Sequence, residues 1–110
     1  MEFSVKNTDG VKVITVVGDV DLKTAPEFQD YVLPLIEPGG RVALEMSGVG
    51  YMSSAGLRAM LMTNREATVK GAKLVLVGLS EEIQDVMSMT GFLTYFQVHA
   101  DLADGIKSLQ

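Results

Sequence analysis

The sequence contains no cysteine, which excludes a disulfide framework and any metal site built from thiolates. No apolar run approaches the ~20 residues that a membrane-spanning helix requires, so we expect no membrane partner. Lys and Arg number 9 against 14 Asp and Glu, without a basic stripe, which argues against direct nucleic-acid binding. Met1 to Ser4 lack the basic and apolar regions of a signal peptide. These absences favour a protein of the reducing cytoplasm.

The chain has 110 residues, and 47% of them are hydrophobic. A chain of this length buries roughly two-thirds of the surface that it exposes when unfolded, which is enough for one core. No low-complexity stretch, composition shift or internal repeat divides it. We therefore expect a single domain over residues 1–110 that is a monomer when free.

Short β-branched and apolar runs alternate with helical patterns along the chain. Strands are expected at residues 2–6, 11–17, 42–46, 73–77 and 96–99. Asp9-Gly10, between the first two strands, is typical of a tight hairpin turn. Helical patterns begin near residues 24, 54, 80 and 101. The order predicts an α/β domain with a mixed, mostly parallel sheet of about five strands and about four helices, opening with an antiparallel hairpin.

The first helix is expected to begin at Thr24, whose side chain would form a capping box with Glu27. Pro26 is tolerated in the first turn of a helix, and Pro34 should end or kink this one because proline has no backbone N–H. Asp101 is expected to cap the last helix.

Methionine occurs seven times. The methionines within the predicted helices are expected to belong to the core: Met60, Met62, Met87 and Met89. Met52 lies instead beside Ser54, at what we expect to be an exposed turn, where a methionine would suit an adaptable interface. A core position for Met52 is the alternative.

The segment Tyr51–Leu57 connects the carboxyl end of an apolar strand to the start of a helix, the edge at which open α/β sheets often bind ligands. Ser54 in this segment can cap the helix through its side-chain oxygen. A phosphate on Ser54 would instead find unpaired N–H groups and the positive end of the helix dipole. Serines before a helix are usually ordinary caps, so spacing alone does not make Ser54 a phosphorylation site. We predict that Ser54 lies on the surface, within one residue of the helix start.

A serine hydrolase is a weaker interpretation of the same segment. Met52-x-Ser54-x-Gly56 approaches the Gly-x-Ser-x-Gly elbow of these enzymes, and Ser54, Asp85 and His99 follow their triad order. The first glycine is missing, however, and the chain is short for such a fold. The two aspartates after the second strand are better explained as solvated or capping groups than as metal ligands. No Walker loop is present, and we expect no cofactor and no metal.

Three motifs resemble the signatures of bacterial anti-sigma factor antagonists, which are stand-alone STAS domains. The motifs extend from Gly18 to Glu27, from Glu45 to Leu57, and from Met89 to Leu93 with Phe96 following. They occur in the family's order and cover almost the whole chain. The resemblance implies a STAS fold and a binding protein, not an enzyme.

The resemblance also implies a partner-switching cycle. In that family the unphosphorylated antagonist binds an anti-sigma factor that is also a serine kinase, and a sigma factor is thereby released. The kinase phosphorylates the antagonist, which then dissociates, and a metal-dependent serine phosphatase resets it. Other STAS roles are the alternatives: a scaffold subunit of a stress-signalling complex, or a cytosolic component of a lipid transport system.

Residue roles follow from aligning Met52 and Gly56 on the family's Met-Asp-Ser-Ser/Thr-Gly-Leu motif. Ser54 then takes the place of the phosphorylated serine. Ser53 stands where the family has aspartate, a departure that makes Ser53 a rival acceptor. By the same resemblance, the residues expected to bind the partner are Asp21, Thr24, Met52, Ser53 and Gly56.

Asp21, Thr24, Met52 and Ser54 are expected to share one surface patch, because both segments follow strands that should be parallel neighbours. Charge reversal at Asp21 is expected to weaken kinase binding with little change in melting temperature, since exposed loop charges rarely affect stability.

Overall fold

A five-stranded mixed sheet forms the centre of the computed structural model, which describes all of residues 1–110. The strands are β1 (Glu2–Thr8), β2 (Val11–Val17), β3 (Arg41–Gly48), β4 (Lys73–Val77) and β5 (Gln97–His99). They lie side by side in sequence order. β1 pairs with β2 antiparallel, and every other pairing is parallel. The predicted fold class is confirmed.

The opening hairpin turns at Asp9 and Gly10, which have positive φ angles of 53° and 80°. Two successive positive φ angles are those of a type I′ turn, whose twist matches the twist of the paired strands. Asp and Gly are among the residues that adopt this conformation most readily. The hairpin predicted from this dipeptide is therefore confirmed.

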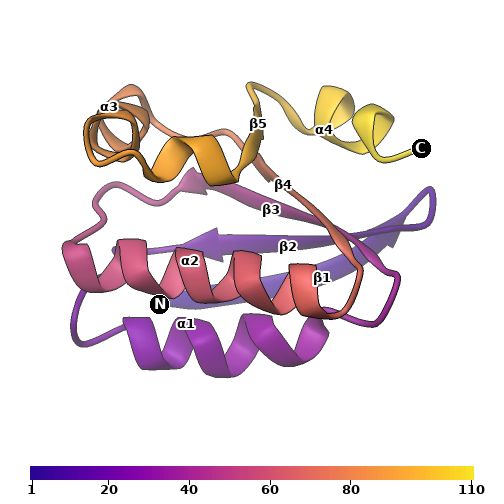
Figure 1. Cartoon of the computed structure of the whole chain (residues 1–110), viewed down its shortest axis with the longest axis horizontal. Coiled ribbons are helices and arrows are strands. Elements are labelled where there is room, and N and C mark those ends of the chain that lie inside the picture. Colours follow the sequence, from indigo (N-terminus) through magenta and orange to yellow (C-terminus); the bar gives the residue numbers. More distant parts are fainter.

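Four α-helices cover the sheet, and two short 3₁₀ helices occur at Leu33–Leu35 and Phe92–Tyr95. The α-helices are α1 (Ala25–Val32), α2 (Ser54–Val69), α3 (Glu81–Met89) and α4 (Leu102–Ser108). In Figure 1, α1 and α2 run side by side along the sheet, and α4 lies near the C-terminus. None of these helices combines the length and the apolar character that crossing a bilayer requires.

The two faces of the sheet carry separate cores. On one face Phe28, Met60 and Met87 from α1, α2 and α3 pack over the apolar side chains of β2, β3 and β4. On the other face α4 places Leu109 over a smaller cluster: Val11, Val13, Ala43, Val75 and Val77. Alternate residues of each central strand therefore serve different cores, as the nearly continuous apolar runs of these strands require.

Two of the four helical methionines do not lie in the core. Met60 and Met87 are fully buried, as expected, but Met62 is 38% exposed and Met89 is 86% exposed. The expectation is wrong for Met62 and Met89, because their helices are covered by the sheet on one side only.

The ends of the helices follow local chemistry. α1 ends at Val32 and continues as the 3₁₀ helix Leu33–Leu35, which contains Pro34, as expected for a residue that cannot donate an N–H. Asp101 caps α4 by accepting the N–H of Asp104 at 2.8 Å. At the start of α1, however, Thr24 makes no side-chain cap and forms no capping box with Glu27. Its hydroxyl is held by the loop that precedes the helix.

Candidate functional site

Two loops meet at the carboxyl ends of β2 and β3. The loop after β2 contains Val20, and the loop after β3 contains Tyr51 and Met52. The N–H of Val20 donates to the Tyr51 carbonyl at 3.0 Å, and the N–H of Ser53 donates to the Val20 carbonyl at 3.0 Å. Val20 and Met52 thus form an isolated parallel β-bridge, which extends the order of the sheet past the ends of its strands. Main-chain hydrogen bonds thus fix two segments about thirty residues apart against each other. Each such bond contributes about 1 kcal/mol to the net stability of the fold.

Ser54 is the first residue of α2, and its side chain is exposed. Ser53 precedes it as the cap, and the Ser53 hydroxyl accepts the N–H of Gly56 at 3.3 Å. The predicted position of Ser54 is confirmed, but the capping role belongs to its neighbour. One serine therefore holds the helix start, and the other presents a hydroxyl to solvent.

Asp21 organises the loop that faces this serine pair. Its Oδ1 accepts the N–H groups of Lys23 and Thr24 at 3.0 and 3.1 Å. The Thr24 hydroxyl donates to the Asp19 carbonyl at 2.7 Å and accepts the N–H of Asp21 at 2.9 Å. The bond from Thr24 N–H, followed by that from Lys23 N–H, lowers the pKa of Asp21, although partial desolvation opposes them. The Asp21 carboxylate is thus tied to its own loop, so its loss is expected to affect stability more than loss of a free loop charge would.

Met52 does not lie on the surface. Its side chain is only 5% exposed and belongs to the larger core cluster. Of the two alternatives for Met52, the exposed turn is wrong and the core position is confirmed, because Met52 pairs with Val20 as a strand residue would and so points inward. Alternation along this short pairing leaves Tyr51 pointing outward, with 55% of it exposed. That alternation is the signal in the sequence that could have distinguished the two residues.

Gly56 is buried in the first turn of α2, directly behind the loop of Asp21. A Cβ at this position would lie 2.2 Å from the Val20 carbonyl oxygen and 2.7 Å from the Met52 Cγ. No side chain fits there without moving the backbone. Gly56 and Met52 therefore shape the site from beneath, while Asp21, Ser53 and Ser54 reach its surface.

Two exposed hydrophobic side chains accompany the serine pair. Leu22 is 80% exposed in the loop of Asp21, and Tyr51 is 55% exposed in the loop before Ser53. Leu22 also lines a shallow hollow between α1 and α2 together with Ala55 and Arg58. The sequence interpretation missed both residues. We call Asp21, Leu22, Tyr51, Ser53 and Ser54 the Ser54 patch.

Ser54, Asp85 and His99, the residues of the hydrolase hypothesis, do not form a hydrogen-bonded triad. Asp85 lies on α3, and His99 lies in β5. The Nε2 of His99 is buried and has no hydrogen-bond partner, so it does not bond the exposed Ser54 hydroxyl. No group of three or more His, Asp or Glu side chains is placed to hold a metal ion.

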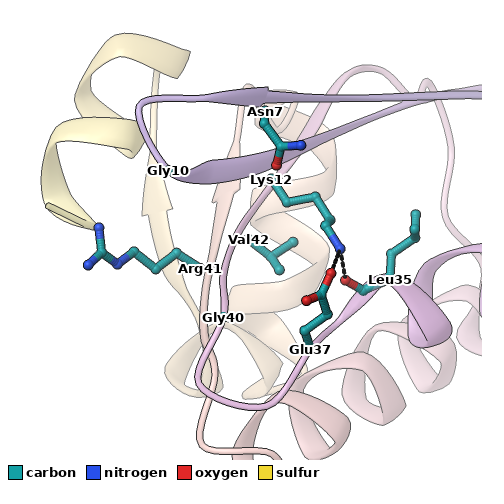
Figure 2. A pocket seen from close by; sticks show the side chains of 8 residues that line it. All are labelled: Asn7, Gly10, Lys12, Leu35, Glu37, Gly40, Arg41 and Val42. Carbon is teal, nitrogen blue, oxygen red and sulfur yellow. Dashed lines mark hydrogen bonds and ion pairs between the residues drawn. The ribbon is translucent and has the colours of Figure 1, made fainter.

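A separate small hollow lies at the opposite end of the sheet, near the start of β3 (Figure 2). The Lys12 ammonium group occupies one side of it, 2.6 Å from the Glu37 carboxylate and 2.7 Å from the Leu35 carbonyl oxygen. The bond to Lys12 lowers the pKa of Glu37. Lys12 and Glu37 in this hollow thus neutralise each other.

Comparison with known proteins identifies relatives of this fold. The STAS domain family model matches residues 2–105. The anti-sigma-B factor antagonist of Bacillus subtilis (strain 168) is 26% identical over 107 residues, which cover 97% of this chain and 98% of that protein.

Two solved structures share the architecture. An anti-sigma factor antagonist from Mycobacterium paratuberculosis superimposes with a TM-score of 0.86 at 21% identity, covering 98% of this chain and 92% of the other. The murine solute carrier 26 family member A9 anion transporter, in its inward-facing state, matches with a TM-score of 0.85 at 18% identity. That match covers 96% of this chain but 18% of the transporter. At these identities the two structures establish the fold alone.

Replacing Gly56 with alanine should lower the free energy of unfolding by about 2 kcal/mol or more, because the added methyl group meets backbone. Gly50→Ala is the matched control: its Cβ would meet only the Asp19 carboxylate, at 3.7 Å. The control should change stability by no more than about 0.5 kcal/mol. Urea unfolding of both variants measures the difference, and equal losses would contradict the close approach at Gly56.

Asp21→Ala should lower the melting temperature more than Asp19→Ala, which removes the same charge but no side-chain hydrogen bond. The folded-state pKa of Asp21 is lowered, so its contribution is present above the ordinary value of 3.8 and is lost as the pH falls through the folded value. Melting curves from neutral to strongly acidic pH should therefore show the parent and Asp21→Ala converging in acid. A gap that stays constant with pH would refute the role of the carboxylate.

Proposed function

The chain belongs to the STAS domain family, and on that premise we propose that it is an anti-sigma factor antagonist controlled by phosphorylation of Ser54. In its unphosphorylated form it binds an anti-sigma factor serine kinase and so releases a sigma factor. Phosphorylation ends the binding, and a metal-dependent serine phosphatase restores it. The chain acts in this cycle as ligand and substrate, in the cytoplasm, and not as an enzyme. The name of the Bacillus subtilis relative, an anti-sigma-B factor antagonist, supports this role.

The observation that carries the proposal is the division of labour between the two serines. The Ser53 hydroxyl is engaged with the Gly56 N–H, whereas the Ser54 hydroxyl is exposed and makes no bond within the protein. A kinase can reach Ser54 without breaking the cap. The N–H groups in the first turn of a helix lack intrahelical partners and favour negative charge, so α2 tolerates a phosphate at this position.

The surroundings of Ser54 are those of a protein-binding surface. Leu22 and Tyr51 offer exposed apolar and aromatic area, which is what supplies most of the binding energy in protein interfaces. A phosphate in the middle of a docked surface adds about −1.5 to −2 charges that must be desolvated. A loss of ~2.7 kcal/mol already weakens binding about a hundredfold, so one phosphate suffices for a switch.

A second candidate function is a STAS module of a transport system, which the shared fold of the murine anion transporter favours. In that role the Ser54 patch would contact another part of a transporter. The two candidates differ in whether a serine kinase modifies Ser54, and the following experiment separates them.

Incubating the parent protein with its cognate kinase and ATP should add one phosphate, which fragment mass spectrometry should locate on Ser54. Ser54→Ala should accept none and keep its stability, because Ser54 is not the cap. Ser53→Ala should still be phosphorylated but lose about 1 kcal/mol of stability. Phosphate on Ser53, or kinase binding undiminished after full phosphorylation of Ser54, would contradict the proposal.

Leu22→Ala should weaken binding to the kinase about tenfold or more, since an exposed leucine in an interface buries apolar area. Val69→Ala is the matched control, because Val69 is 75% exposed but lies at the far end of α2. Both variants should melt close to the parent. Calorimetric titration measures the two affinities, and a similar loss in both would show that Leu22 is not part of the interface.

A further inference from the structure

Arg58 is a cation without an acidic partner beside the Ser54 patch. It is exposed in the second turn of α2. The ion pairs of the protein join Met1 to Glu27, Lys12 to Glu37 and Lys70 to Glu66, and none includes Arg58. Asp30 of α1 lines the same hollow as Arg58, yet the two do not pair. Arg58 is therefore free to meet an anion that the unmodified protein does not supply.

The spacing on α2 places Arg58 one turn after Ser54. Residues four apart on a helix have Cβ atoms about 5–6 Å apart, on the same face. Helical side chains generally lean toward the N-terminus, so an arginine at position 58 can reach back to a group carried by residue 54. An anion followed four residues later by a cation is the favourable order, because the anion is nearer the positive end of the helix dipole.

We infer that Arg58 binds the phosphate of phosphorylated Ser54 within the same molecule, as a clamp that is empty until the serine is modified. The inference rests on the proposed function, which supplies the phosphate. A guanidinium group presents two parallel N–H donors that match two phosphate oxygens, and such charge-assisted bonds are about twice as strong as neutral ones. Arg58 is thereby a positioning residue for the modified state, and it makes no ion pair in the unmodified fold.

The clamp changes what phosphorylation does to the surface. Before modification, the hollow beside the patch exposes a free positive charge. Afterwards the phosphate adds negative charge and the guanidinium is withdrawn onto it. A partner that meets the unmodified surface through an acidic group of its own would lose that contact at the same moment as it meets the phosphate.

The second pKa of the phosphate reports whether Arg58 is in contact with it. This ionisation occurs near pH 6, and an adjacent cation favours it and so lowers the pKa. The nearby acidic groups are Asp30 on α1 and Asp19 and Asp21 in the loop after β2, and Lys23 is the nearby base. These groups are present in every variant. A difference between variants therefore isolates Arg58.

The test uses the full chain with phosphoserine incorporated at position 54 during synthesis, so that no kinase is needed. The phosphorus-31 chemical shift is followed through the titration of the phosphate. Arg58→Gln should raise the phosphate pKa by about half a pH unit, as expected for loss of a charge-assisted pair. Arg58→Lys, which keeps the charge but not the two-donor fork, should give an intermediate value.

Arg65→Gln is the matched control, because it removes the same charge from the same helix. Position 65 lies about 10 Å beyond position 58 and so outside the screening length at physiological salt. The control should titrate like the parent. An unchanged pKa in Arg58→Gln, or an equal rise in Arg65→Gln, would overturn the clamp. That result would leave the proposed function standing, whereas a kinase that fails to modify Ser54 would overturn the proposed function and leave the titration unaffected.

Discussion

The arrangement of the candidate site depends on the main-chain pairing between the loops that follow β2 and β3. Val20 donates to Tyr51 and accepts from Ser53, both at 3.0 Å, so the second loop is held at a fixed height beside the first. The start of α2 follows directly and must pass behind Val20, where only a residue without a Cβ fits. The exposure of Ser54, the burial of Met52 and the position of Asp21 all follow from this contact.

Local patterns predicted most of the fold, because each element is fixed by its own residues. The Asp9-Gly10 turn, the proline-limited end of α1 and the aspartate cap of α4 need only neighbours in the chain. The failures occurred where a distant segment decides the outcome. Thr24 is a good capping residue, but the carbonyl of Asp19 and the N–H of Asp21 take its hydroxyl instead. Whether a helical methionine is buried depends on which side the sheet covers, so Met62 and Met89 were misplaced.

The site was predictable in position but not in the roles of its residues. Strand, loop and helix order placed Ser54 at the start of α2. Motif resemblance could not show that Met52 and Gly56 support the surface from below, because a motif records which residues are required and not which direction they face. Leu22 and Tyr51 escaped notice because single exposed hydrophobic residues are common on protein surfaces. Their meaning comes from lying in the two loops that the main-chain pairing joins.

The separation of the two serine roles bears on how such a switch can work. If the modified hydroxyl were also the helix cap, phosphorylation would alter the first turn of α2 and with it the packing against Val20. In this protein the Ser53 cap and the Gly56 contact do not involve the Ser54 side chain, and the core beneath is closed by Met52. A phosphate on Ser54 would therefore change the charge of the surface while the backbone below it could stay in place. The fold does not need to be bistable for the binding surface to have two states.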